Sequence, residues 1–132
     1  MVANYVRNTS VANSTIGALS QMSIPSQPAF SYEEYERRWD KVRSYMAELN
    51  IDALITFNVE NIFYLTGMDS ENFFDYQCVI LPIADGSPKL VILDFESARA
   101  ENSSITRDIY TYGAFDDPLE FTLQVAAGLS DI

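Results

Sequence analysis

The sequence predicts a single α/β domain, a mixed β-sheet of about five strands flanked by helices. Two observations predict it. Three short runs of branched and aromatic apolar residues have the length of buried strands: Ala53–Phe57, Tyr76–Ile83 and Lys89–Phe95. Segments with helical spacing of apolar residues lie before, between and after these runs. A chain of 132 residues, nearly half of them hydrophobic, can bury one core.

The composition is strongly acidic, with a formal net charge of −11 and a pI near 4.1. Such a chain cannot neutralise nucleic-acid phosphates or an anionic membrane surface, so neither partner is expected. No run approaches the ~20 apolar residues of a membrane span. The single cysteine, Cys78, lies in an apolar run and is expected to be a buried, reduced thiol. We therefore expect a soluble cytoplasmic protein.

The first thirty residues differ in composition from the rest. All nineteen acidic residues lie from Glu33 onward, and the one charged residue of segment 1–30 is Arg7. The segment is rich in Ser, Thr and Asn and lacks the continuous apolar stretch of a secretory signal. We expect residues 1–30 to form a flexible N-terminal arm and residues 31–132 to form the domain.

The first predicted helix begins at Ser31, which has the spacing of a capping box with Glu34. Apolar residues then recur at steps of three and four, which places them on one helix face: Tyr35, Trp39, Val42, Met46 and Leu49. Asn50 is expected to end the helix. The adjacent Arg37 and Arg38 fit a solvated outer face and predict no ligand.

Residues 51–67 combine a strand, a cap, a short helix and a stop. The run Ala53–Phe57 is followed by Asn58, whose side chain can cap a helix from Val59 to Leu65. Three residues of this helix are expected in the core: Ile62, Phe63 and Leu65. Gly67 stands where a helix end needs a residue that tolerates positive φ.

A polar, acidic loop follows at residues 68–75, and a hairpin comes next. Its strands, Tyr76–Ile83 and Lys89–Phe95, are separated by a turn that contains Asp85-Gly86, a dipeptide typical of hairpins. The consecutive apolar residues of both strands indicate a sheet that is covered on both faces.

The last third of the chain predicts two helices and a strand. A short helix is expected at residues 96–102 and a short strand at residues 108–112. Asp117 followed by Pro118 is a typical helix start, and Gly128 marks the expected end. Four residues of this last helix are expected to face the core: Leu119, Leu123, Ala126 and Ala127.

The chain contains no histidine. This excludes Ser-His-Asp and Cys-His catalysis and histidine-ligated zinc within these residues. The five glycines form no dinucleotide-binding or phosphate-binding loop. The adjacent Asp116 and Asp117 come nearest to a metal-ligand pair, and a helix cap explains them. The residues themselves therefore predict no catalytic residue and no metal site.

The ordered motif of residues 51–67, I-D-A-L-I followed by N-x-x-N-I-x-Y-L-T-G, resembles the N-terminal domain of the creatinase/prolidase (aminopeptidase P) family of pita-bread enzymes. The matching residues are Ile51 to Ile55, Asn61, Ile62, Tyr64, Leu65, Thr66 and Gly67. The resemblance extends back over the helix with Arg37, Arg38 and Met46, and more loosely forward to about Leu129. It implies a ribonuclease-H-like fold.

In the resembled family, catalysis uses Asp, His and Glu side chains of a C-terminal domain, mostly around two metal ions. The resemblance therefore implies a fragment, or a separately expressed domain, of an Xaa-Pro dipeptidase- or aminopeptidase-like hydrolase. This chain would hold no catalytic residue, and the divalent metal (Mn, Co or Zn) would be bound in the C-terminal domain. A homodimer is also implied, with a small peptide or amide substrate at the subunit interface.

The resemblance further places the loop after the Y-L-T-G helix over the neighbouring subunit's active site. Aligned without gaps from Asn61, two substrate-contacting positions of creatinase, Phe and Arg, fall on Phe73 and Asp75. An aspartate in place of the cation disfavours creatine, whose carboxylate needs a positive partner. The motif F-x-x-Y-Q-C-V at residues 73–79 is closer to the Xaa-Pro peptidase and ectoine-hydrolase-like branches. Anchoring of the loop to the core remains the other interpretation of Phe73.

Two other functions stay open. One is a self-contained flavodoxin-like or receiver-like domain that binds a small molecule. That function would need a phosphate-binding loop or an acidic pocket after the first strand, where Asn58–Asn61 offer neither glycine nor lysine. The other is a standalone oligomerisation module with no enzyme attached.

Overall fold

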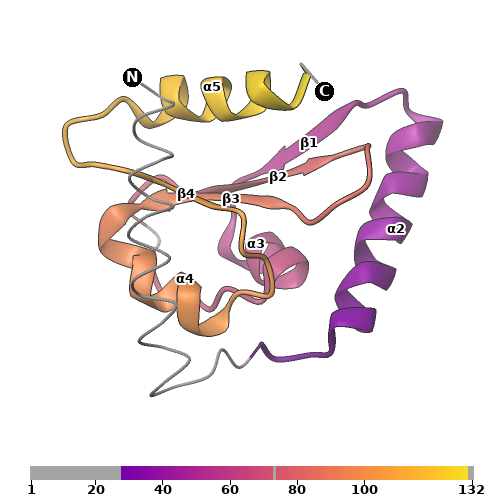
Figure 1. Cartoon of the computed structure of the whole chain (residues 1–132), viewed down its shortest axis with the longest axis horizontal. Helices are drawn as coiled ribbons and strands as arrows, with labels where there is room; N and C mark the ends of the chain where they lie inside the picture. Colours follow the sequence, from indigo (N-terminus) through magenta and orange to yellow (C-terminus); the bar gives the residue numbers. More distant parts are fainter. Residues whose placement is uncertain (1–27, 73, 131–132) are drawn as a thin grey trace.

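The structure is a computed structural model, and it describes residues 28–72 and 74–130 of the chain. In these ranges helices and strands alternate along the chain (Figure 1). Their bounds are α2 (Tyr32–Glu48), β1 (Ala53–Thr56), α3 (Val59–Thr66), β2 (Cys78–Pro82), β3 (Lys89–Leu93), η1 (Asp94–Glu96), α4 (Ser97–Ser103), β4 (Ile109–Tyr112) and α5 (Pro118–Ser130). No helix in the described ranges is both long enough and apolar enough to cross a membrane. The predicted α/β class is confirmed, and most of the predicted arm, residues 1–27, lies outside the described residues.

The strands form one sheet in the order β1-β2-β3-β4. β1 pairs antiparallel with β2, β2 pairs antiparallel with β3, and β3 pairs parallel with β4. The hairpin turn contains Gly86 with a φ of +117°, a backbone conformation that glycine tolerates. The predicted mixed sheet and its hairpin are confirmed, with four strands in the described residues where about five were expected.

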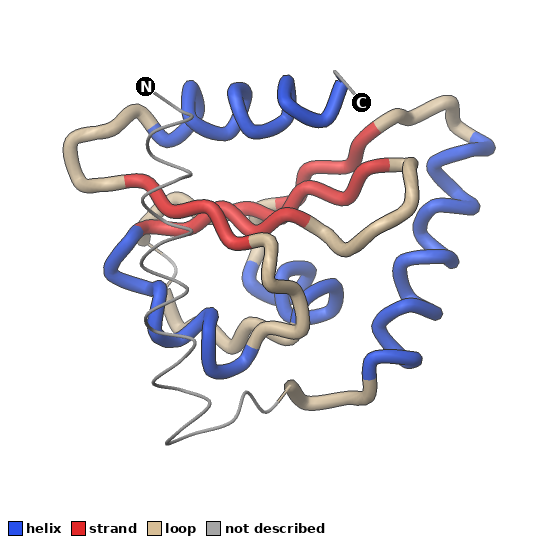
Figure 2. The backbone as a smooth tube through the Cα atoms, viewed as in Figure 1, coloured by secondary structure: helices blue, strands red, loops and turns tan. Residues whose placement is uncertain are grey.

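The hairpin is buried on both faces, as its apolar runs predict. Successive side chains of a strand point to opposite faces. Val79 and Leu81 of β2 therefore pack under α2, α3 and α4, on what we call the first face. Cys78 and Ile80 pack under α5, on the second face. The cartoon and the backbone trace show this layering, with α5 on one side of the sheet and α3 and α4 on the other (Figures 1 and 2).

The first face is closed by contacts between α2 and the end of α3. The buried Trp39 side chain donates from Nε1 to the carbonyl oxygen of Leu65 at 2.7 Å. Arg38 donates to the carbonyl oxygen of Tyr64 at 2.9 Å, and its guanidinium lies 4.6 Å from the centre of the Tyr64 ring. Arg38 is thereby used within the domain, and it helps to dock α2 on α3.

Helix α2 begins and ends close to the predicted positions. Ser31 Oγ accepts a hydrogen bond from the amide of Glu34 at 3.3 Å, and Asn50 follows the helix with a φ of +57°. The expectation that Leu49 joins the core is wrong, because this side chain is 68% exposed. The physical reason is that α2 ends at Glu48, so Leu49 already departs from the helical repeat.

Strand β1 is less buried than its apolar sequence predicts. It lies at an edge of the sheet and pairs with β2 alone among the described strands. Ala53 is exposed, and Phe57, just beyond the strand, is 53% exposed. The apolar run is the same for an edge strand and a central strand, so the sequence cannot separate the two.

Helix α5 rests on the sheet by a different side from the one predicted. Leu119 and Leu123, expected in the core, are 58% and 66% exposed. The side chains that face the sheet are instead Phe121, Thr122 and Val125. The helix carries two apolar stripes, and the one with the aromatic ring is buried, since Phe121 packs against Tyr112. The remaining expectations for this helix are Ala126, which is partly buried, Ala127, which is exposed, and Gly128, which lies inside the helix and does not end it.

Candidate functional site

The candidate site is the loop of residues 68–77, between α3 and β2. Its position depends on α3, and two asparagine side chains fix the turn that leads into this helix. Asn58 Oδ1 accepts from the amide of Asn61 at 2.8 Å, which is the predicted helix cap. Asn61 Nδ2 donates to Thr56 Oγ1, also at 2.8 Å. Both asparagine side chains are therefore engaged in holding the strand-to-helix turn.

Gly67 fixes the direction in which the chain leaves α3. Its φ is +80°, the positive value that the sequence predicts. A Cβ atom here would lie 2.6 Å from Tyr35 Oη and 3.0 Å from the carbonyl oxygen of Ser103. Only glycine satisfies both the backbone conformation and the close contacts, so this position sets where the loop starts.

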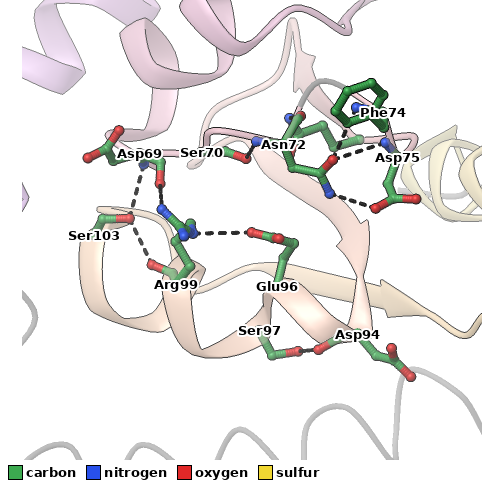
Figure 3. Close-up of polar contacts among 11 residues, drawn as sticks. Asp69, Ser70, Asn72, Phe74, Asp75, Asp94, Glu96, Ser97, Arg99 and Ser103 are labelled. Carbon is green, nitrogen blue, oxygen red and sulfur yellow. Dashed lines mark hydrogen bonds and ion pairs between the residues drawn. The ribbon is translucent and has the colours of Figure 1, made fainter.

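The first part of the loop is fastened to helix α4. The amide of Asp69 donates to Ser103 Oγ at 3.1 Å, and Arg99 Nη1 donates to the Asp69 carbonyl oxygen at 3.3 Å. Ser103 Oγ in turn donates to the Arg99 carbonyl oxygen at 2.8 Å. The Arg99 guanidinium also lies 3.3 Å from the carboxylate of Glu96 (Figure 3). These contacts join the start of the loop to one side of α4.

The tip of the loop is organised by Asn72. Asn72 Oδ1 accepts from the amides of Phe74 and Asp75, both at 3.1 Å, and Nδ2 donates to the Asp75 carboxylate at 2.8 Å (Figure 3). The amide of Asn72 donates to Ser70 Oγ at 3.1 Å. Its carbonyl oxygen accepts from the buried Gln77 side chain at 2.9 Å. The Asn72 side chain therefore closes the turn, and the Ser70 and Gln77 side chains hold the Asn72 backbone.

Of the two predicted site residues, the structure describes Asp75 and does not describe Phe73. Phe73 lies outside the described residues, so its predicted contact with substrate stays a prediction. Asp75 is exposed, and its carboxylate accepts from Asn72 in the closed turn. Sequence reasoning missed Phe74, which is 96% exposed, and the organising role of Asn72. An asparagine two residues before an aromatic side chain in a polar loop is the signal that could have indicated such a turn.

Beneath this loop, the second face contains a small polar cluster. Tyr76 Oη donates to Thr122 Oγ1 at 2.9 Å and lies 3.7 Å from the Cys78 sulfur. Burial raises the pKa of Tyr76 to about 12 and also raises the pKa of the Cys78 thiol. The prediction of a buried, reduced cysteine is confirmed, and this thiol is not activated as a nucleophile.

The two aspartates considered as metal ligands are used by the backbone. Asp116 accepts from the amide of Gly113 at 2.7 Å. Asp117 accepts from the amides of Leu119 and Glu120 at 3.0 and 3.2 Å, as a helix cap does. In residues 28–72 and 74–130, no group of three or more His, Cys, Asp or Glu side chains could hold a metal ion. The donor set of this part of the chain therefore does not fit a two-metal centre.

Comparison with known families gives one match over most of the chain. The family described as the Creatinase/Prolidase N-terminal domain matches residues 38–130. Among curated proteins, the ectoine hydrolase of Halomonas elongata is 41% identical over 68 residues. That alignment covers 52% of this chain and 16% of the relative.

Solved structures agree in fold. The dipeptidase PepE from Mycobacterium ulcerans has a TM-score of 0.63 and 23% identity, over 75% of this chain and 27% of that one. The Creatinase/Prolidase N-terminal domain of an X-Pro dipeptidase from Streptococcus pyogenes has a TM-score of 0.59 and 24% identity. It covers 67% of this chain and 66% of that domain. The chain thus spans a minor part of the ectoine hydrolase and of PepE.

Proposed function

The chain belongs to the creatinase/prolidase N-terminal domain family, and on this basis we propose that it is the non-catalytic N-terminal domain of a metal-dependent Xaa-Pro dipeptidase- or aminopeptidase-like hydrolase. The observation that supports the proposal most is the family match, which runs from α2 into α5. The relatives reported above are described as dipeptidases and as an ectoine hydrolase, and this supports a hydrolase as the whole protein.

In this proposal the catalytic step belongs to a separate domain. The sequence contains no histidine, so it cannot supply the Asp, His and Glu ligands of a two-metal hydrolase centre. The Mn, Co or Zn ions of the enzyme would be held by that other domain. We therefore assign no bond-breaking step to any residue of this chain.

The role proposed for this domain is association in a homodimer and shaping of the pocket for a small peptide or amide substrate. The closed turn at Asn72 supports this role, because it holds Phe74 and the Asp75 carboxylate outward on a fixed base. A backbone that is already held in one conformation loses less conformational entropy when a second surface meets it. The free, buried Cys78 suits the reducing cytoplasm, which we propose as the location.

Incubation of the purified chain with Xaa-Pro dipeptides and Mn²⁺ tests whether the domain is non-catalytic. We expect no release of proline, because no residue of the chain supplies a metal-bound nucleophile. A metal-dependent Xaa-Pro dipeptidase assayed in parallel is the positive control. Metal-dependent turnover by this chain alone would refute the proposal.

Sequencing of the transcript beyond the codon for Ile132 tests whether a hydrolase domain accompanies this one. We expect an open reading frame with an ordered series of Asp, Asp, His, Glu and Glu, the side chains that hold two catalytic metal ions. A stop codon at that point would instead favour a standalone oligomerisation module.

Sedimentation equilibrium of the purified chain tests the proposed role in subunit association. We expect an apparent mass that rises with protein concentration towards that of a dimer. A mass of one chain at every concentration would contradict association through this domain.

A further inference from the structure

Strand β1 has an open edge in the described part of the chain. It is hydrogen-bonded to β2 on one side, and no described strand lies on its other side. The carbonyl oxygen of Asp52 accepts from the amide of Ile83 at 2.8 Å, and the β1–β2 register makes Leu54 the next residue bonded to β2. Because bonded residues alternate in an antiparallel ladder, the backbone N–H and C=O groups of Ala53 and Ile55 point away from β2, towards the open side.

The sequence of β1 does not protect this edge against pairing. Native edge strands usually carry charged side chains, proline or a bulge. Residues 53–57 read Ala-Leu-Ile-Thr-Phe, without charge or proline, and the four residues of β1 pair with β2 without a bulge. In β4, the strand at the opposite edge, three of the four residues are buried, whereas none of the four in β1 is. β1 therefore has the sequence of an inner strand and the burial of a strand that lacks a neighbour.

The apolar cluster under α5 reaches from β4 to this open edge. Phe121 and Val125 of α5 lie in one cluster with Tyr112 of β4, and the partly buried Ile55 of β1 packs against the same cluster. In Figure 1, α5 ends on the right, the side on which β1 begins. A strand that started at this end of the sheet would run in the direction of β1.

The hand of the connections determines where a parallel strand after α5 would lie. Connections between parallel strands of one sheet are right-handed in about 98% of cases. The connection from β3 to β4 runs over the first face, through α4, and steps towards the β4 edge. Because α5 lies over the second face, a right-handed connection from β4 steps the opposite way, towards β1. The positions of β3, β2 and β1 are filled, so the first vacant position in that direction is the open edge of β1.

We propose that the open edge of β1 is the docking site for an extended apolar segment of the polypeptide that follows Ile132, bound parallel to β1. The inference rests on the proposed function, which places a hydrolase domain in the same polypeptide. The segment would pair with the outward N–H and C=O groups of Ala53 and Ile55. Leu54 packs against the first-face cluster and Ile55 against the second, and both are only partly buried. A strand beside them would be covered on both faces, so we expect branched apolar side chains at successive positions.

The transcript beyond the codon for Ile132 gives the first test. We expect, within about ten codons, a run of about five apolar residues rich in Val and Ile, without charge or proline. A reading frame that encodes the metal ligands but has charged or proline-containing sequence at this place would overturn the docking site and leave the proposed hydrolase intact. A stop codon would overturn both.

Fluorescence anisotropy of a labelled synthetic peptide with the sequence of that run, added to the purified chain, tests the edge itself. Ala53→Pro removes an outward N–H group but no hydrogen bond to β2, so it should weaken binding about tenfold. Ala53→Ser is the matched control, because it keeps this N–H group, and it should bind the peptide as tightly as the unchanged chain. Equal binding by the two variants, or no binding by the unchanged chain, would overturn the proposal.

Amide hydrogen exchange of the unchanged chain tests the same site without a substitution. The peptide should slow exchange of the outward Ile55 amide about tenfold, whereas the Leu54 amide, which is already bonded to β2, should change little. Unchanged exchange at Ile55 would overturn the proposal. Self-association of the chain that Ala53→Pro abolishes would also overturn it, and would assign the edge to a second copy.

Discussion

The two faces of the sheet are closed in different ways. The first face holds the larger buried cluster, to which α2, α3 and α4 all contribute, and it is tied by the Trp39 indole to the backbone at Leu65. Among the described residues, the second face holds a smaller cluster under α5 alone, and the hydroxyl groups of Tyr76 and Thr122 lie beside it. The first face is therefore a conventional packed core, whereas the second depends on one helix and on hydroxyl contacts.

The difference follows from chain order. α2, β1 and α3 succeed one another closely, so their contacts form between near neighbours in sequence. α5 comes from the far end of the described chain, and it meets a cluster in which Tyr112 lies 6.2 Å from Tyr76 and 6.4 Å from Phe121, between ring centres. We expect substitutions on the first face to destabilise the protein more than those on the second. The several helices that pack on the first face cannot shift together to fill a cavity, whereas the single helix α5 can.

The largest effect is expected from Gly67→Ala, on the first face. The new Cβ would adopt an unfavourable φ and clash with Tyr35 Oη and the backbone of Ser103, so the free energy of unfolding should fall by about 2–5 kcal/mol. Urea denaturation followed by circular dichroism measures it. Gly86→Ala is the control, because it shares the positive φ but has no atom within 4 Å. Equal losses in both variants would show that packing against Tyr35 contributes nothing.

A matched pair compares the two faces directly. Val79 and Val91 are both fully buried, on adjacent strands of the hairpin, but they belong to opposite clusters. We expect Val79→Ala to lower the free energy of unfolding by about 2–3 kcal/mol and Val91→Ala by about 1–2 kcal/mol. The second loss is smaller because α5 can move to fill part of the cavity that Val91→Ala leaves. Urea denaturation midpoints of the two variants measure these two losses of stability. Equal costs would remove the distinction between the faces.

The pH dependence of stability reports on the second face. The folded state raises the pKa of Tyr76 from about 10 to about 12, so folding favours the protonated phenol. The resulting stabilisation is present in full below the unfolded pKa and is lost as pH rises towards 12. Urea midpoints measured over this alkaline range should fall less steeply in Tyr76→Phe. Burial raises the pKa of Tyr35 and Tyr110 as well, so part of the slope should remain; an unchanged slope would contradict the assignment.

The smallest effect is expected on the outer side of α5. Leu123→Gln should change the free energy of unfolding by no more than about 0.5 kcal/mol, because the side chain is exposed. Val125→Gln, two residues further on, should cost about 2 kcal/mol, because Val125 is buried against the sheet. Thermal melts of both variants test the orientation of α5. A larger loss of stability in Leu123→Gln than in Val125→Gln would show that the buried face of α5 is the one that the sequence predicts.

Local signals in the sequence predicted much of the fold and the start of the candidate loop. The caps at Ser31 and Asn58, the glycine stop at Gly67 and the hairpin at residues 78–93 are all present. Each depends on residues within a turn or two of one another, so a short stretch of sequence contains the whole physical cause. The resemblance carried by residues 51–67 predicted the family for the same reason.

Only the tertiary structure decided which surfaces meet. It placed β1 at an edge of the sheet and turned α5 so that Val125 rather than Leu123 is buried. These outcomes depend on contacts between segments that are far apart in the chain. A helix with two apolar stripes buries whichever fits the opposing surface better, and that surface exists only once the sheet has formed.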